Sequence, residues 1–165
     1  MLLVSLLAFS CKFARMTDSV NSYPSQIGDI EPDSTIDDPT FLPCKEGPIR
    51  QYYEFSGGLM YGGEKYAILE SFKNEYKNQG FNEATGYLIF RFVVNCNGQT
   101  GRFRVTQMDN NFKECKFSAD LVDQMLGLVK RLDKWGVPSD GQQKYDYYQY
   151  LTFKLERGEI AEIVP

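Results

Sequence analysis

One continuous stretch, Gly86 to Phe103 (GYLIFRFVVNCNGQTGRF), constrains the fold more than any other part of the chain. Large apolar residues recur at every second position from Leu88 to Val94, the pattern of a strand with one buried face. The pair Asn97-Gly98 follows, and it accepts the positive φ angles of a hairpin turn. The alternation then restarts at Gly101. The stretch therefore predicts two antiparallel strands joined by a tight turn.

Two amphipathic helices and further strand segments are predicted around this hairpin. Apolar residues spaced four apart predict a helix over Glu64–Gln79, and a serine N-cap before an apolar face predicts another over Ser118–Asp133. Alternation returns over Tyr145–Leu155, and Ile160–Val164 forms a short last strand. We expect an α+β domain over residues 44–165. It has a three-stranded antiparallel sheet with two helices on one face, preceded by an irregular arm.

The N-terminus predicts export and a lipid anchor. Residues 1–10, MLLVSLLAFS, are apolar but too few to cross a bilayer, which takes about 20 helical residues. They have the length of a signal-peptide core. Residues 8–11, AFSC, resemble a bacterial lipobox, which predicts a signal peptide over 1–10 and lipidation of Cys11. The alternative is that Cys11 lies in a cleaved or disordered leader. Residues 11–43 are polar and are predicted to form a disordered tether.

Several kinds of chemistry lack the side chains they need. The chain of 165 residues has no histidine, the commonest general base and metal ligand. No pair of carboxylates can be placed at a catalytic separation, so we expect no enzyme activity, no cofactor and no metal. The net charge is −4 without a concentrated basic stripe, which argues against nucleic acid as a partner.

The cysteines predict one disulfide. If Cys11 is lipidated, three cysteines remain, and an oxidising compartment favours one bond and one free thiol. Cys96 lies in the predicted hairpin turn, and Cys44 lies in the arm that must pack near it. We favour Cys44–Cys96, with Cys96–Cys115 as the alternative. The bond would staple the arm to the sheet and contribute about 2–4 kcal/mol.

These elements together resemble the C-terminal domain of TonB and its relatives, in the lipoprotein type of the Bacteroidetes. The likeness covers about residues 60–156. It is carried by the spaced apolar residues, the glycine-containing turn, the second helix, the tryptophan and the closing strand: Gly86, Phe90, Phe92, Val94, Arg102–Val105, Trp135 and Leu151–Leu155. The resemblance implies a partner recognised by strand addition at an exposed sheet edge, usually that of the last strand. The positions that match this edge are Tyr145, Tyr147, Tyr148, Tyr150 and Thr152.

The sequence therefore predicts a non-enzymatic binding or adaptor module, anchored by lipid and facing the periplasm from the outer membrane. Its expected partner is an envelope protein or peptide, such as an outer-membrane or TonB-dependent transport protein. Two alternatives stay open. The tail Ile160–Val164 would cap the edge in a structural envelope lipoprotein. The tyrosine-rich face would instead stack on a glycan or another small ligand.

Overall fold

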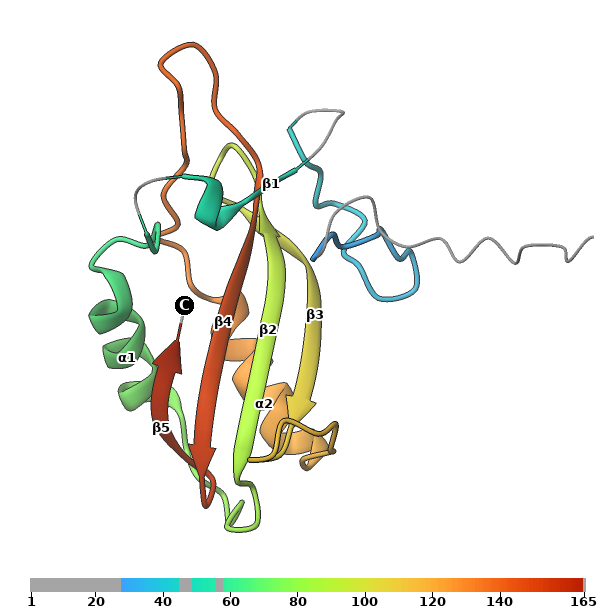
Figure 1. The fold of residues 1–165 in the computed structure, drawn as a ribbon, viewed down its shortest axis with the longest axis vertical. Coiled ribbons are helices and arrows are strands. Elements are labelled where there is room, and N and C mark those ends of the chain that lie inside the picture. Colours follow the sequence, from blue (N-terminus) through green and yellow to red (C-terminus); the bar gives the residue numbers. More distant parts are fainter. Residues whose placement is uncertain (1–27, 45–48, 56–57, 165) are drawn as a thin grey trace, which may run out of the picture.

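A computed structural model describes residues 28–44, 49–55 and 58–164. The elements follow the chain in this order: β1 (Arg50–Gln51), the 3₁₀ helix η1 (Tyr52–Glu54), α1 (Glu64–Glu75), β2 (Gly86–Val94), β3 (Thr100–Met108), α2 (Ala119–Lys130), β4 (Tyr147–Glu156) and β5 (Glu159–Val164). The five strands form one sheet, and the two α-helices pack against it (Figure 1). The predicted α+β class is confirmed.

The sheet is larger than the three antiparallel strands expected. Its order is β1-β4-β2-β3, with β5 also paired to β4. β1 runs parallel to β4, so the sheet is mixed. β1 and β5 share the outer side of β4, because β1 reaches only its first residues and β5 only its last (Figure 1). β1 is too short to give an alternating pattern, whereas β5 contains the short last strand predicted at Ile160–Val164.

The predicted hairpin is β2 and β3, joined by a turn at Asn95–Gln99. The backbone N–H of Asn95 donates to the carbonyl of Gln99 (2.8 Å), and Gly98 adopts a φ of 79°. A bulge interrupts the ladder: Arg91 pairs with Arg104, but Val93 pairs with Gly101. Arg102, within this bulge, has a φ of 53°.

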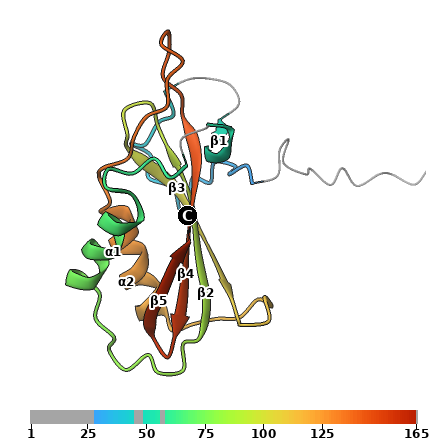
Figure 2. The same ribbon diagram turned by 60° about the vertical axis from the view of Figure 1, so that its left-hand side comes forward.

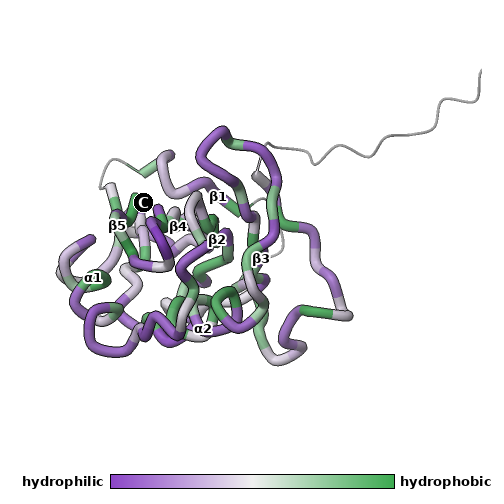
Figure 3. Tube along the Cα trace, turned by 90° about the horizontal axis from the view of Figure 1, so that it is seen from below, coloured by the Kyte–Doolittle hydropathy of each residue, from purple (hydrophilic) through white to green (hydrophobic). Residues whose placement is uncertain are grey.

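One face of the sheet is covered by both helices, as Figure 2 shows. Viewed along the strands, α1 lies beside β5 and α2 lies below β2 and β3 (Figure 3). The side chains that every second strand residue sends to this face form the main core, with Leu88, Phe90, Phe92, Leu151, Phe153 and Leu155 all fully buried. The helices are shorter than expected at their C-terminal ends. Tyr76 is already extended and buries its ring, with its hydroxyl donating to the carbonyl of Gly158.

The opposite face is covered at the hairpin-turn end by residues 28–44; from here on the arm means these residues, all of which except Cys44 belong to the predicted tether. Ile30 is only 4 % exposed and packs with Val93 and Tyr148 of the sheet. Phe41 lies against Gly101, where a Cβ atom would come within 2.1 Å of its ring. The described part of the segment expected to be a disordered tether is therefore packed on the domain. Its few apolar residues are enough to hold it on the sheet, because Ile30 and Phe41 both pack against strand residues.

Candidate functional site

The edge of β4, predicted to receive a partner strand, is paired over most of its length. β1 pairs with Tyr147 and Tyr148, and β5 pairs with the far half of the strand from Thr152 onward. Between them, the side-chain Nε2 of Gln149 donates to the carbonyl of Tyr150 (2.8 Å). The C-terminal tail therefore pairs with the second half of β4, as the alternative of a capped edge expects.

Three of the tyrosines proposed for that edge are packed inside the domain. Tyr147 is fully buried on the helix side, where its hydroxyl donates to the carbonyl of Gly136 (3.0 Å), and burial raises its pKa far above the usual value. Tyr148 is 5 % exposed on the arm side. Tyr150 is half-buried beside it and donates to Oε1 of Gln51 (3.3 Å). These rings stabilise the sheet and offer no open stacking face.

The other two predicted residues lie apart: Tyr145 precedes β4 by two residues, and Thr152 lies in the middle of the strand. Tyr145 is half-buried, and the guanidinium of Arg50 sits 3.9 Å from its ring centroid. Its hydroxyl donates to the carboxylate of Asp140, which lowers the pKa of Asp140 to about 2. Thr152 pairs with Val164. The five positions therefore do not form one continuous binding surface.

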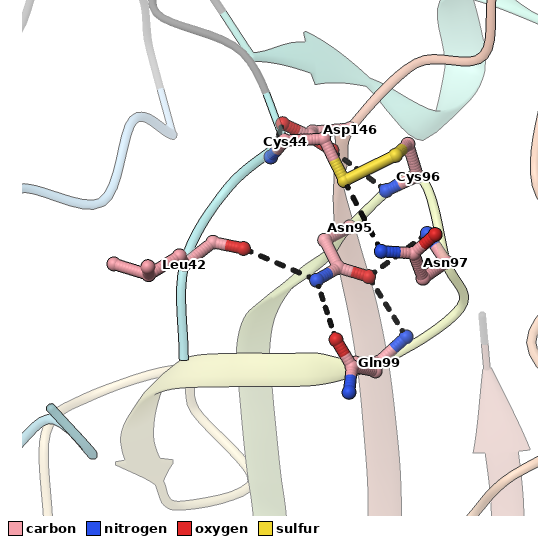
Figure 4. Close-up of a disulfide and its surroundings, with 7 residues drawn as sticks. All are labelled: Leu42, Cys44, Asn95, Cys96, Asn97, Gln99 and Asp146. Atoms are coloured by element: carbon pink, nitrogen blue, oxygen red, sulfur yellow. Dashed lines mark hydrogen bonds between the residues drawn. A yellow bond between two sulfur atoms is a disulfide. The ribbon is translucent and has the colours of Figure 1, made fainter. Parts of the chain in front are cut away.

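The predicted disulfide Cys44–Cys96 is confirmed, with Cα atoms 5.8 Å apart (Figure 4). The buried carboxylate of Asp146 accepts hydrogen bonds from the backbone N–H groups of both cysteines, at 2.8 and 2.7 Å. The side-chain amide of Asn95 donates to the carbonyl of Leu42 (3.1 Å). The C-terminal end of the arm is thus tied to the hairpin turn by one covalent bond and several polar contacts.

The same group has the spacing of a metal site, because sulfur and carboxylate ligand atoms of Cys44, Cys96 and Asp146 lie within 4.8 Å of one another. As a disulfide, however, the sulfurs are not thiolate ligands. Cys115 is the free cysteine among the described residues, and burial raises the pKa of its thiol. A raised pKa lowers the thiolate fraction at neutral pH, so Cys115 is a weak nucleophile, and its backbone N–H donates to the carbonyl of Gln107 at the other end of β3 from the disulfide.

The open edge of the sheet belongs to β3. In an antiparallel ladder, both backbone groups of a residue point to one side, and the side alternates along the strand. The carbonyl of Gln107 accepts from the N–H of Cys115 (3.1 Å) outside the sheet, so Val105 also turns its N–H and C=O outward. In the described part of the chain, no hydrogen bond outside the ladder reaches Val105. The loop at Lys113–Cys115 covers only the end of this edge, at Gln107 and Met108.

A groove of about 740 Å³ runs along β3. Its lining comes from both sides of the sheet, so the groove follows the strand edge itself. The apolar part is provided by Phe103, Val105, Leu126 and Ile36, and the charged part by Arg91, Arg102, Arg104, Lys130, Asp37 and Asp38. β3, α2 and the arm each contribute one wall.

Arg104 fixes the arm wall. Its two terminal nitrogens donate to the carboxylate of Asp37, at 2.6 and 3.0 Å, and one of them also donates to the carbonyl of Glu31 (2.7 Å). The hydrogen bond from Arg104 lowers the pKa of Asp37, so this carboxylate stays ionised to a lower pH than a free aspartate. Arg104 is 20 % and Asp37 12 % exposed, which shields the pair from solvent.

Only part of this site is predictable from the sequence. The alternation of the sequence places Arg91 and Arg104 on the face away from the helices, where a solvated surface is the simplest interpretation. No sequence pattern places the arm, since Ile30 and Phe41 stand alone among polar residues. Gly101, a glycine inside a strand, was the one available signal of a close approach.

No protein-family model, curated protein or solved structure matches the chain. Among the described residues, no helix is both long and apolar enough to span a membrane. Cys11 and the predicted signal peptide lie outside the described residues.

Proposed function

We propose that this protein is a non-enzymatic binding module that takes an extended segment of a partner protein along β3. The observation that carries the proposal is the outward backbone of Val105, which has no partner among the described residues, within a groove built from three elements. An edge strand of this kind supplies main-chain hydrogen bonds for affinity, and flanking side chains supply selectivity. The resemblance to TonB C-terminal domains supports the same mode of recognition at a different strand.

The proposal keeps the expected setting. A lipid anchor at Cys11 would hold the module on the periplasmic side of the outer membrane, next to an envelope protein as partner. Residues 28–44 pack on the domain, so any spacer from the anchor is the shorter stretch that precedes them.

The test replaces one edge residue on each side of the sheet. Val105→Pro removes the outward N–H without breaking the ladder to β2, because proline is tolerated on edge strands. Ala161→Pro is the matched control: Ala161 is the extra residue of a bulge in β5, between Ile160 and Glu162, on the opposite edge. The full chain, with Cys11→Ser to prevent acylation, is used to select from a random 12-residue peptide display library. Selected peptides are then measured by fluorescence polarisation.

We expect selected peptides to bind at least about tenfold more weakly to Val105→Pro, the equivalent of one or two main-chain hydrogen bonds. Binding to Ala161→Pro should match the unsubstituted chain. Thermal unfolding of both variants checks that they fold. The proposal falls if no peptides are enriched, or if Val105→Pro binds them as well as the control does.

A second candidate function is a structural envelope lipoprotein. The pairing of β5 with β4 favours it, because this pairing closes the edge that a TonB-like module would use. A structural protein predicts no peptide enrichment in the same selection.

A further inference from the structure

The groove along β3 has an uneven set of charges. Among the described residues, its cations Arg91, Arg102 and Lys130 form no salt bridge, whereas Arg104 is occupied by Asp37. Asp38 is the one other carboxylate in the lining, and its side chain accepts from Thr40 instead. The chain as a whole carries a net charge of −4, so the groove reverses the sign of the molecule locally.

Arg102 is held there against its conformational preference. It is one of four described non-glycine residues with a positive φ, and the only one of the four that lines the groove. The left-handed region disfavours residues with a Cβ atom, and glycine is the usual occupant of this bulge position. Arg102 lines the groove together with Asp37 and Asp38 of the arm, and it follows Gly101, which packs against Phe41 of the arm.

The two sides of the strand edge therefore differ in chemistry. On the arm side, an added strand would meet Arg91 and Arg102. On the helix side it would meet Phe103 and Val105, with Leu126 behind them. Neighbouring strands place side chains of like direction beside one another, and opposite charges at such positions attract.

We infer that the partner segment is an extended acidic peptide in which carboxylate residues alternate with apolar residues. This inference rests on the proposed function, since it assigns the ligand class of the same edge. Carboxylates at alternate positions would face Arg102 and Arg91, and the intervening apolar side chains would cover Phe103 and Val105.

The test uses the peptides selected above. We expect Asp and Glu to be enriched at alternate positions relative to the input library. Replacing the acidic residues of the best peptide by Gln should weaken its binding about threefold per carboxylate. Raising NaCl from 0.05 to 0.5 M should weaken the acidic peptide much more than its Gln version.

Arg102→Gly removes the charge and keeps a backbone that adopts a positive φ. Arg157→Gly is the matched control, because Arg157 also has a positive φ, of 50°, but lies in the β4–β5 turn. Arg102→Gly should weaken the acidic peptide about threefold or more and leave the Gln version unchanged, and Arg157→Gly should affect neither. If acidic and Gln peptides bind equally while Val105→Pro abolishes both, the acidic ligand class is wrong and the edge-binding function stands. If Val105→Pro changes nothing, the proposed function fails as well.

Discussion

The two faces of this sheet are covered by different means. On the helix face, α1 and α2 bury a continuous apolar core. On the arm face, four buried residues form a small cluster at one end: Ile30, Ile49, Val93 and Tyr148. The arm is held there by a disulfide, the pairing of Arg104 with Asp37 and the hydrogen bonds to Asp146 and Asn95.

This difference separates stability from binding. Apolar burial on the helix face is insensitive to redox state and to moderate changes of pH, whereas a disulfide responds to redox state and an ion pair responds to pH. The arm also supplies one wall of the β3 groove through Ile36, Asp37 and Asp38. The helix face thus stabilises the sheet that holds β3, and the arm face forms a wall of the groove beside β3.

The largest expected effect is on the helix face. Phe153 is fully buried, and its ring lies 4.7 Å from that of Phe72 and 5.6 Å from that of Phe90, centroid to centroid. Phe153→Ala should lower the free energy of unfolding by about 3–5 kcal/mol. Urea unfolding followed by the fluorescence of Trp135, the single tryptophan, measures it. Thr152→Ala, at the next position and half-buried, is the control and should cost under about 1 kcal/mol. Equal losses would show that the helix face is not the main source of stability.

The second effect concerns the anchor of the arm. The disulfide closes 52 residues of chain, so replacing both Cys44 and Cys96 by Ser should cost about 2–4 kcal/mol. The same urea titration measures this loss, and hydrogen exchange shows whether the arm loses protection first. Cys115→Ser is the control, because Cys115 is not bonded. Unchanged exchange in the arm of the double variant would contradict an arm held by the crosslink.

The third prediction concerns acid. The pKa of Asp37 is lowered in the folded state, so its contribution to stability is complete above the unfolded value of about 3.9 and is lost as pH falls below it. The methyl NMR signals of Ile30 should therefore report loosening of the arm below about pH 4, while the Phe153 region stays folded to lower pH. Asp37→Asn should remove this pH step, and Asp123→Asn, on the exposed side of α2, should not. A step that survives Asp37→Asn would assign it to another group.

Periodic and paired residues could be predicted from the sequence, and isolated contacts could not. The hairpin and both helices follow from spacing and turn residues, whereas the cysteine count favours Cys44–Cys96 but leaves Cys96–Cys115 open. β1 consists of two residues, which is too short for any period. The cover of β4 depends on β5 and on Gln149, a polar residue inside an apolar strand. The candidate groove was missed because the arm reaches β3 through single residues far apart in sequence.

The smallest effect is expected at Arg102. A residue with a Cβ atom in the left-handed region destabilises the folded state by about 1–2 kcal/mol. Glycine destabilises it by about 0.5–1 kcal/mol in another way, because its unfolded chain has more conformational entropy to lose. Arg102→Gly should therefore raise the free energy of unfolding by about 0.5 kcal/mol. Urea unfolding followed by Trp135 fluorescence measures this change. Arg157→Gly is the reference, because Arg157 also has a positive φ and the same gain is expected there. If Arg102→Gly instead lowered the free energy of unfolding by more than about 1 kcal/mol, the Arg102 side chain would stabilise the fold. An arginine at this position would then be explained by stability, without a ligand. A gain in stability together with weaker binding of an acidic peptide would show that Arg102 contributes to binding and not to stability.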